Sequence, residues 1–200
     1  MPKTHQQCIL IKEQRAKSIL KTALYLFASK GYNAVTMDEI AKETNCSHGL
    51  IYHYFPNKEK LFVTMMEDYV IPKNREIIAD IDFTQKAKDV MHNLLDDYLK
   101  ALKSDDDEKA CVVHILLKLR LEAQYIPKPP VLNRRKRIFD WVHDTIERGK
   151  KEGDFNDSDT KDTAIAILSM LTGLSYYRIN LDYKKFNCPN VDVIMKMLLK

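Results

Sequence analysis

The sequence predicts an all-α fold in which a small N-terminal domain is joined to a larger helical bundle. Nearly every segment carries apolar residues at helical spacing, and no segment shows the alternation typical of a half-buried strand. Glycine is scarce, with five residues in 200, and the sequence contains no internal repeat or flexible linker. Hydrophobic residues at 45% and charged residues at 30% are typical of globular proteins that bury a sizeable core.

The first predicted helix ends at Gly31. Ile19, Ala23 and Phe27 fall on one face of this helix, which is the spacing of an amphipathic helix. Glycine readily adopts the left-handed conformation that commonly terminates a helix. A helix that buries this apolar face therefore stops at Gly31.

Two short helices follow, separated by the turn at residues 45–47. Thr36 begins the first of them, and Glu39 three residues later completes a capping box. Ser47 caps the next helix, which runs through Tyr54. Two short helices joined by such a turn form a helix-turn-helix. The residues expected to face inward and set the angle between the two helices are Met37, Ile40, Ala41, Leu50 and Ile51.

The rest of the chain predicts a helical bundle. A fourth helix runs from Lys58 to about Ile71, where Pro72 interrupts it. Further periodic stretches lie at about 85–103, 109–124, 131–152, 159–180 and 190–200. We therefore divide the chain into a helix-turn-helix domain at residues 1–57 and a second domain at residues 58–200, joined directly by the fourth helix.

The positive charge is concentrated in the first 60 residues. They contain nine Lys and Arg against five Asp and Glu, together with His5, His48 and His53. Residues 61–200 contain 23 of each sign, so the whole net charge of +4 comes from the N-terminal part. A basic region attracts phosphates because their neutralisation releases counterions. Charge alone leaves two readings open, a phosphate-binding surface and an ordinary solvated basic surface.

The cysteines and the hydropathy pattern indicate a cytoplasmic protein. Cys8, Cys46, Cys111 and Cys188 lie far apart without CxxC spacing, as expected for free thiols in a reducing compartment. The N-terminus lacks the apolar core of a signal peptide. The longest uncharged stretch, at residues 163–177, is too short to span a bilayer. We expect no membrane partner.

The sequence gives no indication of an enzyme. It has no phosphate-binding glycine loop, no HExxH motif and no pairing of a nucleophile with a base. Cys111 and His114 are spaced as two metal ligands on a helix, but zinc needs three or four. We therefore predict no catalytic residues, no metal and no cofactor.

The N-terminal residues resemble the TetR family, the tetracycline-repressor-like regulators. The resemblance covers Ala-x-x-Leu-Phe at 23–27, Gly31, Thr-Met-Asp-Glu-Ile-Ala at 36–41, Ser-His-Gly-Leu-Ile-Tyr-His-Tyr-Phe at 47–55 and Lys-Glu-Lys-Leu at 58–61. Asn45 stands where the family usually has a turn glycine, and asparagine is the next best residue for a left-handed position. Several spaced motifs in one continuous segment are far more specific than a lone helix-turn-helix pattern.

The resemblance implies that the N-terminal helices bind operator DNA. Tyr52, Tyr54 and Lys58 resemble phosphate contacts of the family. Thr36 and Ser47, which cap the two helices, can also donate to phosphate. His48, Gly49 and His53 occupy the places aimed at bases or at the adjoining backbone. Phosphate contacts set the register, which leaves few side chains to specify sequence. The predicted DNA-binding residues are Thr36, Ser47, His48, Gly49, Tyr52, His53, Tyr54 and Lys58.

The resemblance also implies that the C-terminal bundle binds a small effector and forms a dimer. Polar or aromatic groups set among apolar ones are candidates for the effector pocket: His92, Tyr98, His114, Trp141, Tyr176 and Tyr177. Apolar stripes on the last two helices are candidates for the dimer interface: Ile167, Leu168, Leu171, Leu174, Ile194, Met195 and Leu198. The alternatives are that a buried histidine such as His114 is only a core residue and that the stripes belong to the core of one chain.

These features predict a homodimeric repressor that an unidentified small molecule releases from a palindromic operator in double-stranded DNA. Two half-sites one helical turn apart require a twofold protein. An activator, a regulator that needs a co-repressor, and a DNA-bound adaptor that recruits a protein partner are the alternatives. The sequence specifies neither the effector nor the operator.

Overall fold

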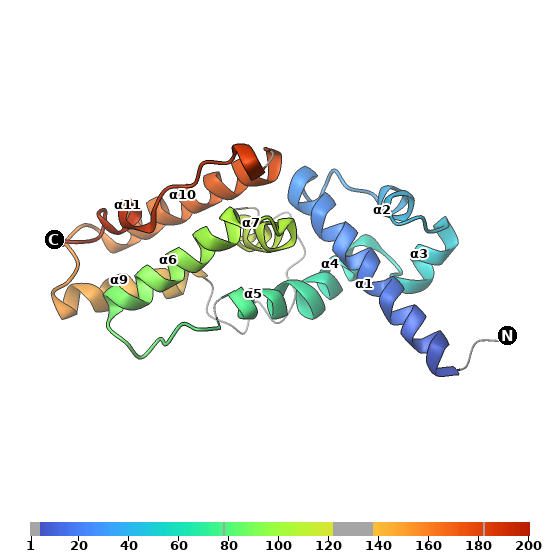
Figure 1. Cartoon of the computed structure of the whole chain (residues 1–200), viewed down its shortest axis with the longest axis horizontal. Helices are drawn as coiled ribbons and strands as arrows, with labels where there is room; N and C mark the ends of the chain where they lie inside the picture. The colour runs from blue at the N-terminus through green and yellow to red at the C-terminus, as the bar shows by residue number, and fades with distance from the viewer. Residues whose placement is uncertain (1–4, 78, 122–137, 182) are drawn as a thin grey trace.

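The part of the chain that the structure describes is built from helices joined by short loops (Figure 1). The structure is a computed structural model that describes residues 5–77, 79–121, 138–181 and 183–200. The elements are α1 (His5–Lys30), α2 (Met37–Glu43), α3 (His48–Tyr54), α4 (Lys58–Met65), the π-helical turn η1 (Met66–Val70), α5 (Ile71–Ile77), α6 (Ala87–Lys103), α7 (Asp107–Leu121), α9 (Ile138–Glu152), α10 (Thr160–Asn180), the short 3-10 helix η2 (Tyr183–Lys185) and α11 (Val191–Met195). Among these residues, extended pairing is limited to one isolated bridge between Phe155 and Leu199. The predicted all-α class is confirmed.

Two hydrophobic clusters form the core, and α7 contributes to both. The N-terminal cluster gathers α1 to α4 and η1, whereas the C-terminal cluster gathers α6, α9, α10 and α11. Cys111, Val112 and Ile115 of α7 belong to the N-terminal cluster, and Val113 and Leu117 to the C-terminal one. Figure 1 accordingly shows α7 between the two halves of the molecule. The predicted boundary after residue 57 remains a prediction, although α4 packs with the N-terminal helices.

The fourth predicted helix changes type before Pro72 and continues beyond it. The backbone N–H of Ile71 donates to the carbonyl of Met66, five residues earlier, which is the bond of a π turn. Proline has no N–H, and its ring would meet the carbonyl of Asp68 in a regular α-helix. A wider turn before it relieves that clash, so the helix resumes as α5. The predicted interruption is therefore a local change of helix type.

The C-terminal helix is shorter than the sequence predicts. We expected a helix over residues 190–200, but α11 ends at Met195. The backbone N–H of Asn156 donates to the carbonyl of Leu198 at 2.8 Å, and the Asn156 amide donates to the carbonyl of Met197 at 3.0 Å. These bonds tie the end of the chain to the α9–α10 loop in place of a further helical turn. The predicted helix at 159–180 is confirmed as α10, while residues 122–124 and 131–137 of two other predicted helices lie outside the described residues.

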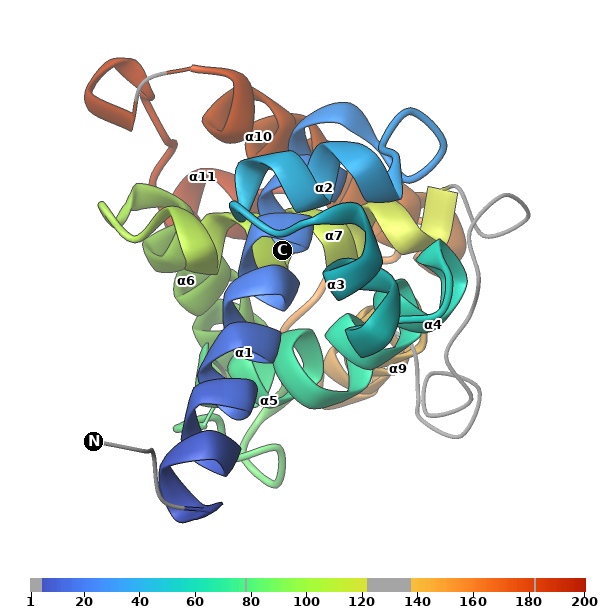
Figure 2. The same cartoon turned by 90° about the vertical axis from the view of Figure 1, so that its right-hand side faces the viewer.

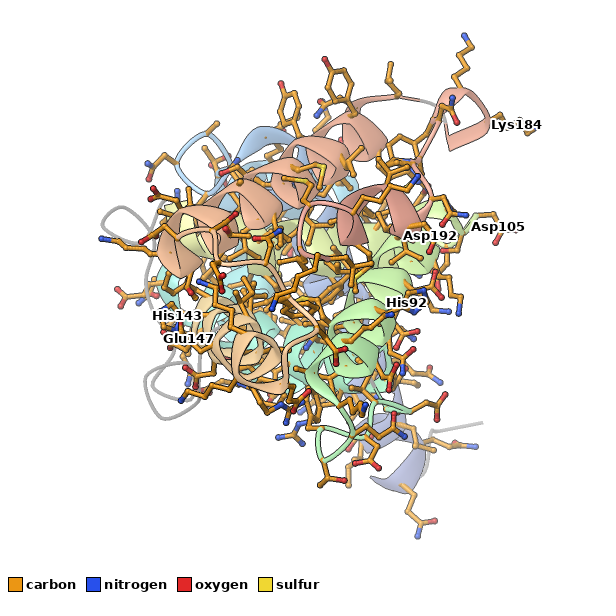
Figure 3. All side chains as sticks on the ribbon, turned by 90° about the vertical axis from the view of Figure 1, so that its left-hand side faces the viewer. His92, Asp105, His143, Glu147, Lys184 and Asp192 are labelled. Atoms are coloured by element: carbon orange, nitrogen blue, oxygen red, sulfur yellow. The ribbon has the colours of Figure 1, made fainter. Side chains whose placement is uncertain are left out.

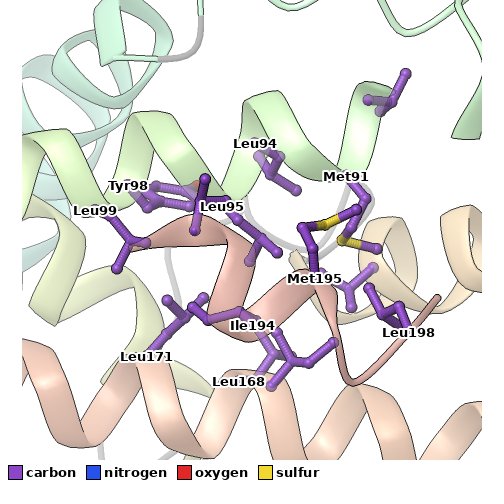
Figure 4. Packing of buried hydrophobic residues seen from close by; sticks show 14 of the residues in the cluster. Met91, Leu94, Leu95, Tyr98, Leu99, Leu168, Leu171, Ile194, Met195 and Leu198 are labelled. Atoms are coloured by element: carbon purple, nitrogen blue, oxygen red, sulfur yellow. The ribbon is translucent and has the colours of Figure 1, made fainter. Parts of the chain in front are cut away.

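The C-terminal cluster is held mainly by α6, α10 and α11. Figure 4 shows Met91, Leu95 and Leu99 of α6 packing toward Leu171 of α10 and Ile194 of α11. On the outer side of this layer, His92 of α6 lies 4.0 Å from the carboxylate of Asp192 on α11 (Figure 3). In the described part of the chain, no helix is both long and apolar enough to cross a membrane.

Candidate nucleic-acid interface

The start of α2 is fixed by a side-chain cap. The hydroxyl of Thr36 accepts the backbone N–H of Glu39 at 3.1 Å, which is the N-cap bond of the predicted capping box. Lys30 at the end of α1 donates to the Glu39 carboxylate at 2.5 Å, and this bond holds the pKa of Glu39 below its usual range. The predicted cap at Thr36 is therefore present. The bond from Lys30 also joins α2 to the helix before it.

The turn between α2 and α3 has the conformation that its sequence predicts. Asn45 adopts a left-handed φ of 51°, which is the role predicted for it in place of glycine. Arg15 of α1 donates to the Asn45 carbonyl at 3.0 Å, so the turn is anchored to the long first helix. The Ser47 hydroxyl accepts the backbone N–H of Leu50 at 3.3 Å and caps α3. The direction of α3 is thus set by local backbone bonds.

The two faces of the helix-turn-helix separate as predicted. Four of the residues expected to face inward are buried, and Leu50 is half-buried. Six of the eight predicted DNA-binding residues are exposed: Thr36, Ser47, His48, Gly49, Tyr52 and His53. A Cβ added at Gly49 would meet no atom within 4 Å, so packing within the chain does not require a glycine there. Figure 2 shows α2 and α3 at the outer end of the molecule, in front of α7.

His48, the first residue of α3, is held on two sides. Its Nδ1 atom lies 2.5 Å from a carboxylate oxygen of Asp38 on α2. The rings of His48 and Tyr52 have centroids 4.8 Å apart and are tilted by 44°. Sequence reasoning did not single out Asp38 as a site residue. In the sequence, an acidic residue in the first turn of a helix is explained by its favourable interaction with the helix dipole. Its contact with His48 arises only because α3 packs against α2.

Tyr54 and Lys58 have roles within the chain. Tyr54 is half-buried and packs against the N-terminal cluster. The Lys58 ammonium donates to the carbonyls of Tyr32 and Val35, both at 3.0 Å, and lies 4.4 Å from the centre of the Tyr32 ring. These contacts fasten α4 to the α1–α2 loop. An ammonium has three N–H groups, so one remains after these two bonds, and the predicted phosphate contact stays a prediction.

The six predicted pocket residues lie in different environments. Tyr98 is buried and donates to the Asn74 side chain at 3.2 Å. His114 is buried between α7 and α10, where its Nδ1 atom lies 2.8 Å from the Ser175 hydroxyl. His92 lies at the surface of α6, and Tyr176 and Tyr177 are more than half exposed on α10. Trp141 alone of the six lines the pocket described next. Residue type alone could not predict which of these side chains line a pocket, because their neighbours belong to helices that are distant in sequence.

An open pocket of about 270 Å³ lies between α6, α9 and the loop before α6. Its lining combines aromatic, apolar and charged side chains: Phe83, Val90, Trp141, Asp144, Thr145 and Arg148. The rings of Phe83 and Trp141 meet edge to face with centroids 4.1 Å apart. Arg148 donates to the carbonyls of Phe83 at 3.0 Å and Gln85 at 2.9 Å, which holds the loop against α9.

The residues predicted to form a dimer interface lie in the core of the chain itself. Six of the seven are buried, and the partly buried Leu174 packs against the same cluster. The buried six are Ile167, Leu168, Leu171, Ile194, Met195 and Leu198. Within the chain, α7 and α9 cover the side of α10 that carries the buried stripe, so the assignment of these residues to a partner contact stays a prediction. The alternative, that the stripes belong to the intrachain core, is what the structure contains.

Comparisons with known proteins agree with the local geometry. The family described as "Bacterial regulatory proteins, tetR family" matches residues 19–65, which run from α1 to the end of α4. The regulator YuxN of Bacillus subtilis is 49% identical over 57 residues, which are 28% of this chain and 20% of that protein. The B. subtilis regulator YhgD is 26% identical over 180 residues, which are 88% of this chain and 87% of that protein.

Solved structures share the fold over nearly the whole chain. A TetR-family regulator from Agrobacterium tumefaciens superposes with a TM-score of 0.67 and 20% identity, covering 94% of this chain and 99% of that one. A transcriptional regulator from Saccharomonospora viridis, solved in complex with choline, superposes with a TM-score of 0.62 and 23% identity, with the same two coverages. The capped α2–α3 unit, the matched N-terminal segment and these neighbours lead to one conclusion. Residues 19–65 carry the N-terminal segment of the TetR family of DNA-binding bacterial transcriptional regulators, and the chain as a whole has the fold of solved TetR-family regulators.

Proposed function

We propose that the chain is a homodimeric, sequence-specific repressor that a small-molecule effector releases from a palindromic operator. The observation that carries this proposal is the outward face of α3. Its exposed residues are polar or aromatic, its inner face is buried, and its start is fixed by the Ser47 cap. A helix presented in this way can enter the major groove.

The roles in DNA binding divide by chemistry. Hydroxyl groups and the ammonium contact phosphates, through Thr36, Ser47, Tyr52, Tyr54 and Lys58. The remaining exposed groups of α3, His48, Gly49 and His53, approach base edges or the sugar-phosphate backbone. Nine basic against five acidic residues in the first 60 give the local positive charge that such contacts need.

A second copy binds through the outer face of α10. Ile165, Tyr176 and Tyr177 are 40%, 56% and 61% exposed on the side opposite the buried stripe. Ser169 and Gly173, at helical spacing between them, are also exposed, and a Cβ added at Gly173 would meet no atom within 4 Å. Small residues flanked by exposed aromatic ones allow two helices to approach closely. Ile165→Arg should therefore yield monomers with an unchanged helical content.

Charged residues at the start of α7 link the bundle to the N-terminal helices. Glu108 forms ion pairs with Lys21 of α1 at 2.9 Å and with Lys73 of α5 at 3.8 Å. Burial opposes its charged form, but hydrogen bonds from Lys21 and Tyr69 hold the pKa of Glu108 below its usual range. Asp107, the residue before it, forms an ion pair with Arg178 of α10. A ligand that moves α7 therefore moves α1, and with it the distance between two α3 helices in a dimer.

The pocket beside α9 is the first place to look for the effector. Two aromatic rings and the Asp144 carboxylate are groups that hold quaternary ammonium compounds. One structural neighbour was solved with choline. Choline is therefore the first ligand to test, and Trp141→Ala is the variant that should abolish its effect.

The test combines sequence selection with a ligand titration. Purified protein selects duplexes from a random pool at a stated salt concentration, and sedimentation gives the mass of the complex. A palindromic motif bound by a dimer supports the proposal, and loss of the complex on adding ligand supports effector release. A selected motif with no internal symmetry, or a complex that contains only a monomer, would contradict the proposed dimeric repressor. Tighter binding with ligand would indicate a co-repressor.

A further inference from the structure

We propose that Asp38 is a specificity-determining residue that acts through His48. Its carboxylate fixes which nitrogen of the His48 ring faces the DNA. The inference rests on the proposed function, because it requires His48 to approach a base edge. It assigns a role to a residue that neither touches a base in this scheme nor serves a purely structural purpose.

The geometry joins two exposed side chains across the turn. The Asp38 and His48 side chains are 71% and 69% exposed, yet their polar atoms lie 2.5 Å apart. They come from different helices and are ten residues apart in sequence. Tyr52, one turn further along α3, packs beside the ring with centroids 4.8 Å apart. The ring is therefore bonded at one edge and packed on one face, which leaves the opposite edge to the solvent.

The chemistry of the pair determines what that free edge presents. An ionised carboxylate can only accept hydrogen bonds, so the Nδ1 atom of His48 must carry the proton and donate it. Nε2 is then the nitrogen that can approach a base edge. Without the carboxylate, the ring could turn over and present either nitrogen, because rotation about the terminal bond is broad and roughly twofold. Asp38 thus removes one of two orientations before DNA is bound.

A carboxylate on this face also acts on binding to DNA of any sequence. Phosphates within a Debye length, about 8 Å at physiological salt, repel it whichever bases are present. Asp38 therefore lowers the affinity for unrelated DNA and, through His48, raises the affinity for one base pair. Both effects increase the ratio of specific to non-specific binding, which is how a repulsive group can contribute to specificity.

The alternative is that Asp38 only stabilises α2. Acidic residues in the first turn interact favourably with the helix dipole, and Asp38 is the second residue of α2. That role predicts a lower melting temperature on substitution and an unchanged DNA motif. The two roles therefore differ in what a substitution changes.

The experiment compares four variants of the full chain with the unsubstituted protein. They are Asp38→Asn, His48→Ala, the double variant and Glu43→Gln. Glu43 is the matched control, because it is an exposed carboxylate at the other end of α2. Each protein selects from the same random duplex pool, and its affinity is measured for the selected operator and for an unrelated duplex. Melting temperatures are measured in parallel.

We expect Asp38→Asn and His48→Ala to lose enrichment at the same base pair of each half-site, and the double variant to lose no more. Asp38→Asn should bind unrelated DNA about threefold more tightly and the operator about threefold more weakly, so that the specificity ratio falls about tenfold. Glu43→Gln should keep the full motif.

Other outcomes separate the two proposals. If His48→Ala changes the motif and Asp38→Asn does not, the role of Asp38 is wrong and the proposed function stands. A lower melting temperature for Asp38→Asn with an intact motif would assign it to helix stability alone. If neither variant alters the motif, or the unsubstituted chain selects none, the base-reading role of α3 fails and the inference fails with it.

Discussion

The helix-turn-helix and the C-terminal bundle bury their helices in different ways. Helix α3 packs on one side only, with Ile51 buried and its neighbours Tyr52 and His53 exposed. In α7, by contrast, every residue from 110 to 115 is buried, because one face meets the N-terminal cluster and the other meets the bundle. Where burial is one-sided, the polar face identifies the functional surface. Where burial is two-sided, the apolar pattern identifies only the core.

Helix α10 shows what this difference means for finding a partner surface. Its most regular apolar stripe, with Ile167 and Leu171, is covered by its own chain. Its exposed apolar residues, with Tyr176 and Tyr177 among them, form no continuous stripe in the sequence. An interface in such a bundle is therefore indicated by apolar groups left outside the core. The predictions below test the contrast between the two regions, beginning with the largest expected effect.

Gly149→Ala should destabilise the bundle severely. A Cβ at this position would overlap the ring of Phe155, which is 1% exposed and cannot move outward without leaving the core. We expect a loss of about 3 kcal/mol in the free energy of unfolding, measured by denaturant titration. Gly49→Ala in α3 is the matched control, since its Cβ would meet no atom within 4 Å and should stabilise the helix. Equal stability of the two variants would contradict the tight packing at Gly149.

Asp107→Ala should weaken the attachment of α7 to α10. The Arg178 side chain is 4% exposed and donates to Asp107 at 2.6 Å and to the carbonyls of Leu102 and Ser104. Removing the carboxylate leaves a buried guanidinium without this anion. Because Asp107 itself is 63% exposed, the loss is about 2 kcal/mol, below that of a fully buried pair.

The control for this variant is Asp105→Ala, an exposed aspartate two residues earlier that lies at the surface in Figure 3. Thermal unfolding of both proteins gives the comparison. Similar melting temperatures would mean that the Asp107–Arg178 pair does not stabilise the junction of α7 with α10.

Local backbone chemistry explains how much of the helix-turn-helix the sequence predicts. The cap at Thr36, the left-handed Asn45 and the cap at Ser47 each depend on residues within a few positions. The direction of α3 and its exposed residues follow from them. Asp38 was missed because its contact with His48 depends on how two helices pack, which no local rule gives.

The bundle is predicted in outline and not in detail. Helix α10 follows from its periodicity, but the side it buries depends on α6 and α7, which lie far away in sequence. The C-terminal turn is lost to hydrogen bonds with Asn156, a partner some 40 residues away. The six pocket candidates were chosen by residue type alone, and residue type does not fix which side chains converge on a cavity.

His114 should make the stability of the bundle depend on pH. Burial of the ring, with a smaller contribution from the nearby Lys118 ammonium, lowers the pKa of His114 to about 4. The unfolded chain therefore binds a proton below about pH 6.5 that the folded chain does not bind, so stability falls as pH falls through that value. The loss between pH 7.5 and pH 5 is about 2 kcal/mol.

Denaturant titrations of the unsubstituted chain and of His114→Gln over this pH range provide the measurement. Glutamine keeps a donor for Ser175 and does not titrate, so its pH dependence should be flatter. His92→Gln, which removes a second histidine of the bundle, is measured in parallel. Parallel curves for His114→Gln and the unsubstituted chain would rule out this histidine as the source.

Gly49→Ala should separate stability from DNA binding in the N-terminal region. A Cβ here would meet no atom within 4 Å, and alanine is the better helix former, so the free energy of unfolding should rise by roughly 0.5–1 kcal/mol. If the backbone of α3 approaches DNA at this residue, the added methyl group displaces that contact. Operator affinity should then fall by about tenfold, which corresponds to about 1.4 kcal/mol. If Gly49→Ala is more stable and still binds its operator normally, the backbone of α3 does not approach the DNA at this residue. Neither packing within the chain nor DNA binding would then explain the glycine.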